Sequence, residues 1–115
     1  LMHASADSNL KRLHLELGGK APVLVYSDAD VAQAVAKITE GAFCNSGQDC
    51  MAASRLYVHD SVHDEFVAGL EKAVKELNLG DTADENTSMG PVITAAHRDR
   101  VEGFVERAKP PGTPS

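Results

Sequence analysis

The sequence contains no tryptophan, aromatic residues make up 4% of it, and its charge is not basic, because 17 acidic residues outnumber 11 lysines and arginines. A net charge of −6 with so few stacking side chains argues against nucleic acid and anionic membranes as partners. No apolar run approaches the ~20 residues of a transmembrane helix, and the first residues lack the basic-then-apolar order of a signal peptide. We therefore expect a cytoplasmic protein that binds neither nucleic acid nor membrane.

Cysteine is also scarce, with Cys44 and Cys50 standing six positions apart. A disulfide between them would need a sharp bend, so free thiols in a reducing compartment are the simpler interpretation. We expect no metal site, because the sequence has no C-x-x-C pattern. His59 and His63 stand four apart, but they flank the start of a predicted helix and need not share a face.

What the chain does have is enough apolar sequence for one domain or part of one, with 43% hydrophobic and 24% charged residues in 115. Alternating leucines predict a strand over residues 13–17, which Gly18 and Gly19 end. A continuous apolar run over residues 23–26 is typical of a buried parallel strand, and residues 55–59 predict a second buried strand.

Two apolar stripes at helical spacing predict amphipathic helices, formed by Val31, Val35, Ile38 and Ala42, and by Val62, Phe66, Leu70, Val74 and Leu77. We expect Ser27 or Asp28 to cap the first helix, and Gly80 to end the second in a left-handed conformation. Strand, helix, strand and helix in this order predict an α/β fold, a βαβα segment with a parallel sheet.

A third helix, capped by Thr94, is predicted to run to Ala108. We assign residues 1–108 to one domain, and we expect the proline-rich tail, residues 109–115, to be disordered because proline cannot continue the helix.

The turn between the first helix and the second strand ends at Cys50. Gly47 relaxes the backbone there, and the polar residues around it predict that the chain leaves its helix before Cys50. A thiol in such a turn can face a cleft and act as a nucleophile. The alternative is a buried structural thiol, because free cysteines are among the most buried residues.

A second candidate is Glu16, which lies among apolar neighbours just before a Gly-Gly turn. A carboxylate in these surroundings would be partly desolvated, and this makes it a better general base. On its own, Glu16 could equally be a strand residue that faces solvent.

Together, Glu16-Leu17-Gly18-Gly19-Lys20 and Gly47-Gln48-Asp49-Cys50 resemble two motifs of the aldehyde dehydrogenase superfamily, in the right order and at the family's separation of 34 positions. The resemblance implies a segment of a Rossmann-like catalytic domain that uses NAD or NADP. Cys50 would attack an aldehyde and hydride would pass to the nicotinamide, after which Glu16 would activate the water that releases a carboxylic acid. The backbone N–H of Cys50 would stabilise the oxyanion, and Leu17 and Gly18 would lie near the nicotinamide.

The resemblance covers only part of a family member. The family's oxyanion asparagine, glycine-rich cofactor turn and ribose-binding glutamate lie outside these residues, so we expect the chain alone to be inactive. Family members are usually dimers or tetramers, which predicts a homo-oligomer. The motifs look most like the aminobutyraldehyde and betaine-aldehyde branch, in which Asp49 could favour a cationic ω-amino aldehyde. Cys44 stands where the family usually has a bulky residue, and we expect it to be a core contact.

Two hypotheses compete with the enzyme. The first is a non-catalytic βα domain that packs against partner chains, with Cys50 as a structural thiol. The second is a cysteine hydrolase, which would require a histidine near Cys50.

Overall fold

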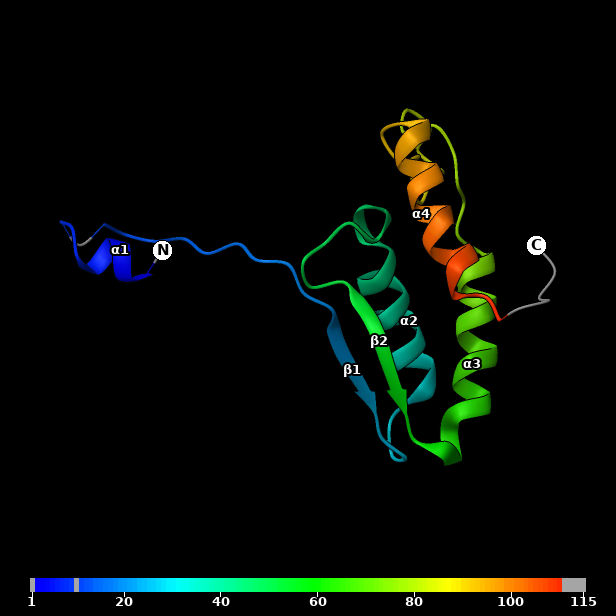
Figure 1. Ribbon diagram of the computed structural model, residues 1–115. Coiled ribbons are helices and arrows are strands. Elements are labelled where there is room, and N and C mark those ends of the chain that lie inside the picture. The colour runs from blue at the N-terminus through cyan, green and yellow to red at the C-terminus, as the bar shows by residue number, and fades with distance from the viewer. Residues whose placement is uncertain (1, 10, 111–115) are drawn as a thin grey trace.

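The structure is a computed structural model that describes residues 2–9 and 11–110. Its centre is a parallel pair of strands, β1 (Ala21–Val25) and β2 (Ala53–Val58), joined by the helix α2 (Val31–Phe43). The helix α3 (Asp60–Lys75) follows β2 and packs beside α2, as Figure 1 shows. This order confirms the predicted α/β fold with a parallel sheet.

The core lies between one face of the sheet and the two helices. It is formed by Val25, Val35, Ile38 and Phe66, and Phe66 is 1% exposed. Gly69 lets the helices approach closely, since a Cβ at this position would lie 3.1 Å from a methyl group of Val35. Six of the nine residues of the two predicted stripes lie in this core or pack against it: Val31, Val35, Ile38, Val62, Phe66 and Leu70. Ala42 and Val74 are not part of the cluster, and Leu77 lies beyond the end of α3.

The other face of the sheet is open within this chain. Leu24 and Tyr57 are paired across the strands and point away from the helices, with 58% and 55% of their surfaces exposed. The prediction of two fully buried strands is therefore wrong. A parallel sheet normally carries helices on both faces, and here both helices cover the same one.

Helix boundaries differ from the prediction at two ends. Asp30 caps α2, and its side chain accepts a hydrogen bond from the backbone N–H of Gln33 at 3.0 Å. The expected caps, Ser27 and Asp28, lie in the preceding turn, which the Ala29-to-Tyr26 hydrogen bond closes. The helix α3 ends at Lys75.

Gly80 does not end α3, and its φ is not positive. Its N–H instead donates to the carbonyl of Met89 at 3.3 Å and so holds the two ends of a polar loop together. Among the described residues, only three consecutive positions have positive φ, and they lie elsewhere: Asn45, Ser46 and Gly47.

The segment 11–20 is not a strand. It runs from α1 (Met2–Ala6) toward β1 without forming sheet pairs. Figure 1 shows α1 far from the sheet at the end of this segment. The alternating leucines therefore gave a wrong prediction, because alternation makes a strand only where a neighbouring strand supplies backbone partners.

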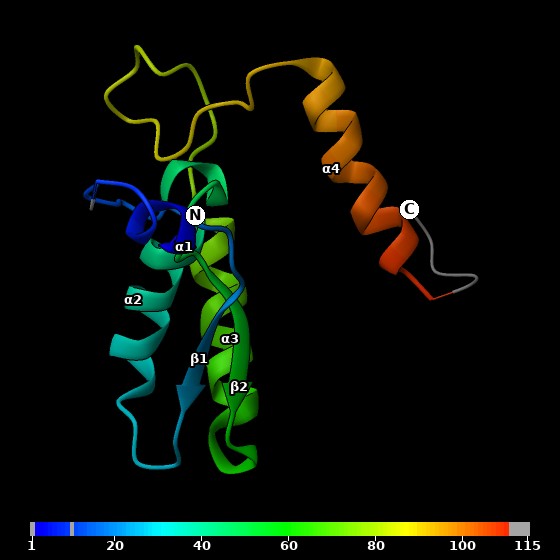
Figure 2. The same cartoon turned by 60° about the vertical axis from the view of Figure 1, so that its left-hand side comes forward.

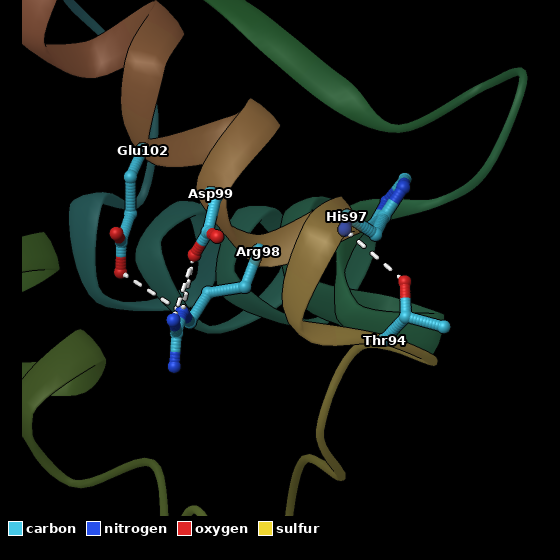
Figure 3. A network of polar contacts seen from close by, with 5 residues as sticks. All are labelled: Thr94, His97, Arg98, Asp99 and Glu102. Atoms are coloured by element: carbon cyan, nitrogen blue, oxygen red, sulfur yellow. Dashed lines mark hydrogen bonds and ion pairs between the residues drawn. The ribbon is translucent and has the colours of Figure 1, made fainter.

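The last helix, α4 (Ala95–Ala108), begins as predicted, because the Thr94 hydroxyl accepts a hydrogen bond from the His97 N–H at 3.1 Å. Figure 3 shows this cap beside the guanidinium of Arg98, which pairs with Asp99 and Glu102. All of these groups are largely exposed, so the ion pairs add little stability. The tail predicted to be disordered is residues 109–115. Lys109 and Pro110 follow the helix, and residues 111–115 lie outside the described residues.

α4 also stands away from the sheet, as Figure 2 shows most clearly. The radius of gyration is 18.6 Å, whereas a compact domain of this length has about 13 Å. The accessible surface is 9308 Å², whereas a compact protein of this mass exposes about 6,100 Å². The packed part of the chain is thus the unit of β1, α2, β2 and α3. None of the helices in residues 2–9 and 11–110 has the length and apolar character needed to cross a membrane.

Candidate active site

The segment before β1 lies against the turn before β2. The Arg55 side chain donates from Nε to the carbonyl of Lys20 at 2.9 Å. One residue earlier, a Cβ on Gly19 would lie 3.5 Å from the carbonyl oxygen of Cys50. Because β1 and β2 are parallel, the residues that precede them meet at the same edge of the sheet. This edge is where both predicted site residues lie.

Glu16 and Cys50 are brought together at this edge. The pKa of the Cys50 thiol is raised, first by a hydrogen-bonding interaction with the Glu16 side chain, then by partial desolvation, and then by the charges of Glu16 and Asp49. Two carboxylates near a thiol disfavour the thiolate. A thiol whose pKa is raised gives up its proton less readily than a free thiol, and the Glu16 carboxylate is near it.

Both side chains are exposed in this chain. The expected desolvation of Glu16 is therefore not found, because no other element of this chain covers the segment 11–20. The hypothesis of a buried structural thiol is not supported in this chain, because Cys50 is exposed. The cysteine-hydrolase hypothesis gains no support, since the groups that act on the thiol are the two carboxylates, and no histidine is among them.

A tight turn holds Cys50 between Asp49 and β2. The carboxylate of Asp49 accepts a hydrogen bond from the N–H of Met51 at 2.6 Å, and its carbonyl accepts one from Ala52 at 3.2 Å. These two bonds bracket Cys50 and restrict the orientation of its peptide groups.

Before this turn, the chain leaves α2 through η1 (Cys44–Gly47), in which Asn45, Ser46 and Gly47 have φ of 50°, 59° and 75°. The expectation that the helix ends before Cys50 is confirmed, and Gly47 adopts the relaxed backbone that was predicted. The left-handed conformation of Asn45 and Ser46 was missed, although an asparagine two positions before a glycine is a weak signal for it. Cys44 is exposed, so its predicted role as a core contact is wrong.

The surroundings of Leu17 and Gly18 leave room for a flat ring such as a nicotinamide. Leu17 is 66% exposed, and no atom lies within 4 Å of a Cβ built on Gly18. A nicotinamide could approach both without a clash, so these residues fit a contact with that end of a dinucleotide. No group of three or more potential metal ligands occurs in the part of the chain that the structure describes, residues 2–9 and 11–110.

The site is an open surface within this chain. A cavity of about 850 Å³ lies between η1 and the loop after α3, lined by Phe43, Ser46 and residues 79–82 and 89–92. A second, of about 560 Å³, lies over the carboxyl ends of the strands and α3. Neither cavity includes Glu16 or Cys50.

The fold and the site together define a class, the α/β proteins that present a thiol and a carboxylate at one edge of a parallel sheet. The family model described as "Aldehyde dehydrogenase family" matches residues 1–113. The chain therefore belongs to the aldehyde dehydrogenase family, as the two motifs suggested.

Three relatives illustrate the likeness. The chain is 45% identical over 113 residues to aldehyde dehydrogenase [NAD(P)+] 1 of Saccharomyces cerevisiae, covering 95% of this chain and 22% of the relative. It is 45% identical over 102 residues to betaine aldehyde dehydrogenase of Bacillus subtilis, covering 89% and 21%. The solved structure of lactaldehyde dehydrogenase from Escherichia coli superposes with a TM-score of 0.78 at 44% identity, covering 93% and 23%.

The structural match confirms the predicted Rossmann-like α/β segment. The chain spans about a fifth of the length of these relatives.

Proposed function

We propose that the complete enzyme oxidises an aldehyde to a carboxylic acid with NAD or NADP, using Cys50 as the nucleophile and Glu16 as the general base. The observation that carries this proposal is that the segment before β1 lies against the Cys50 turn, where a Cβ on Gly19 would lie 3.5 Å from the Cys50 carbonyl oxygen. The Glu16 carboxylate is close enough there to raise the pKa of the Cys50 thiol. The two residues are 34 positions apart, and the fold brings them to one edge of the sheet. Membership in the aldehyde dehydrogenase family supports the reaction class.

In the first half of the reaction, the sulfur of Cys50 attacks the aldehyde carbon and a C–S bond forms. The thiol proton passes to solvent, and the backbone N–H of Cys50 donates a hydrogen bond to the new oxyanion. Loss of a hydride from this adduct then leaves a thioester on Cys50. NAD or NADP, when bound, supplies the hydride acceptor. Leu17 and Gly18 are the residues of this chain that would contact the nicotinamide.

In the second half, Glu16 removes a proton from a water molecule that attacks the thioester on Cys50. The C–S bond breaks, the carboxylic acid leaves, and the sulfur recovers a proton. General-base assistance of this kind is worth about 10²- to 10⁴-fold in rate. An exposed Glu16 would perform this step best in a cavity that the rest of the enzyme closes.

The substrate class we propose is an ω-amino aldehyde or another cationic aldehyde. Asp49 supports it, because its charge lies close enough to the thiol to act on the pKa of Cys50, and a negative charge attracts a cationic substrate. The likeness to a betaine aldehyde dehydrogenase also favours it. The equally similar yeast relative is named only for aldehydes.

We further propose that the 115-residue chain alone is inactive and that the complete enzyme is a cytoplasmic dimer or tetramer. The open sheet face at Leu24 and Tyr57 supports the first point, because such apolar surface is normally covered. Catalysis also requires the oxyanion asparagine and the ribose-binding glutamate, which are expected outside these residues. Aldehyde oxidation by the isolated chain would contradict this proposal.

The function can be tested by trapping the acyl group. Glu16→Gln in the complete enzyme removes the base without changing the size of the side chain, so an acyl adduct should accumulate on Cys50 when aldehyde and NAD(P) are supplied. Mass spectrometry of the peptide that contains Cys44 and Cys50 locates the adduct. Cys50→Ala is the matched control and should show no adduct. An adduct on Cys44, or none in the Glu16→Gln variant, would contradict the proposal.

A further inference from the structure

The link between α2 and β2 contains an unusual run of left-handed backbone. Helices commonly end with one residue in this conformation, usually glycine. Here three residues in succession adopt it: Asn45, Ser46 and Gly47. Glycine adopts it freely and asparagine tolerates it, but serine does so at a cost. A conformation that costs energy persists only where the surroundings impose it.

Two amide side chains hold this turn from both ends. The Asn45 side chain donates from Nδ2 to the carbonyl of Gln48 at 3.0 Å, and the Gln48 side chain donates from Nε2 to the carbonyl of Asn45 at 3.1 Å. The backbone N–H of Gln48 donates to the same Asn45 carbonyl at 3.2 Å. A carbonyl can only accept, so both amide nitrogens must face inward. The result is a ring of three hydrogen bonds around the left-handed residues.

A fourth hydrogen bond ties the turn to a distant part of the chain. The Ser46 hydroxyl donates to the carbonyl of Gly90 at 3.1 Å, across 44 positions of sequence. Gly90 itself is tightly packed, because a Cβ at this position would lie 2.6 Å from the methyl group of Thr82. The residue that bears the backbone cost is thus the one anchored to the loop after α3.

We propose that Asn45 and Gln48 are positioning residues for Cys50, whose reciprocal amide clamp fixes the left-handed turn and thereby directs the thiol toward Glu16. Gln48 is two positions from Cys50, and the Asp49 turn begins immediately after it. A rotation of the Gln48 peptide would therefore also move the Cys50 thiol. The inference deepens the proposed function and rests on it, because it needs the Glu16–Cys50 pair to be the working arrangement.

The clamp can be tested by coupling, without measuring activity. The charged groups that act on the thiol are Glu16, from the segment before β1, and Asp49, beside it. In the folded 115-residue chain, Glu16→Gln should lower the pH midpoint of Cys50 alkylation by iodoacetamide, because a carboxylate that raises the pKa has been neutralised. Peptide mass spectrometry separates Cys50 from Cys44. The midpoint shift in the native background is the reference.

The same shift is then measured with the clamp removed, in Asn45→Gly, in Gln48→Ala and in the double variant. Glycine keeps the left-handed backbone accessible, and both sites are exposed, so the fold should persist, as circular dichroism can verify. In these variants we expect Glu16→Gln to leave the pH midpoint of Cys50 alkylation unchanged. If Gln48→Ala alone folds, it suffices for the test.

The outcomes separate the inference from the function beneath it. An equal shift with and without the clamp overturns the positioning role and leaves the Glu16–Cys50 pair intact. No shift in the native background contradicts the pair itself, and the inference with it.

Discussion

The packed unit and the candidate site use the chain in opposite ways. In the unit, Phe66 and Ile38 are 1% and 6% exposed, and apolar spacing alone explains their places. At the site, Cys50 and Glu16 are exposed, and each stands on a segment without regular secondary structure. The site segments are positioned by backbone hydrogen bonds and by the parallel register of β1 and β2. Stability and chemistry therefore reside in different residues and can be changed separately.

The largest difference between an effect on activity and an effect on stability is expected at Cys50. Cys50→Ala in the complete enzyme should lower aldehyde oxidation by about 10⁴-fold or more, because the covalent route is lost. The same change in the chain should alter the free energy of unfolding by no more than about 0.5 kcal/mol, since the side chain is exposed. Steady-state rates and urea denaturation measure the two effects. A large loss of stability would place Cys50 in the packed unit after all.

At Phe66 the main effect of a substitution is expected on stability. Phe66→Ala should lower the free energy of unfolding by about 3–5 kcal/mol, since it empties the centre of the core between α2, α3 and the sheet. The matched control is Val67→Ala on the same helix, where the side chain is 46% exposed, and it should cost less than about 1 kcal/mol. Equal effects in urea denaturation would mean that the core has been misplaced.

A smaller effect should expose the strain in η1. Ser46→Ala loses the hydroxyl that donates to Gly90 and keeps a Cβ in a left-handed position, whereas Ser46→Gly loses the same bond but relieves the backbone. The glycine variant should therefore be the more stable of the two by about 1 kcal/mol. Thermal unfolding followed by circular dichroism measures the difference. An alanine variant as stable as the glycine variant would argue against a left-handed Ser46.

The same contrast decides what could be predicted from the sequence. Helical spacing located the stripes of α2 and α3, because burial imposes a period that the sequence must show. The two motifs predicted that Glu16 and Cys50 share a site, and the structure brings the segments that carry them to one edge of the sheet. The conformation of Asn45 and Ser46 could not be predicted, because it depends on hydrogen bonds to Gln48 and to the distant Gly90.

The errors have related causes. Residues 13–17 alternate like a strand but find no neighbouring strand in this chain, and the core contact predicted for Cys44 proved to be an exposed position. Gly80 was expected to end a helix, yet α3 stops earlier, and the glycine is used where a Cβ would lie 2.7 Å from the Thr87 hydroxyl. These errors concern contacts, or missing contacts, beyond the span of one helix or strand, which local pattern does not contain.

The central claim is that folding places the Glu16 carboxylate against the Cys50 thiol. The pKa of Cys50 should then be raised in the folded chain, and the thiolate should form only at higher pH than in an unfolded peptide of the same sequence. As pH rises, the unfolded chain loses the Cys50 thiol proton before the folded chain does. The free energy of unfolding therefore falls between the ordinary thiol pKa and the raised pKa of the folded state.

The most direct measurement is the pH midpoint of Cys50 alkylation in the folded chain, in that unfolded peptide and in the folded Glu16→Gln variant. The account predicts the highest midpoint in the native chain and a fall toward the peptide's value when Glu16 is neutralised. Identical midpoints in all three samples would contradict it.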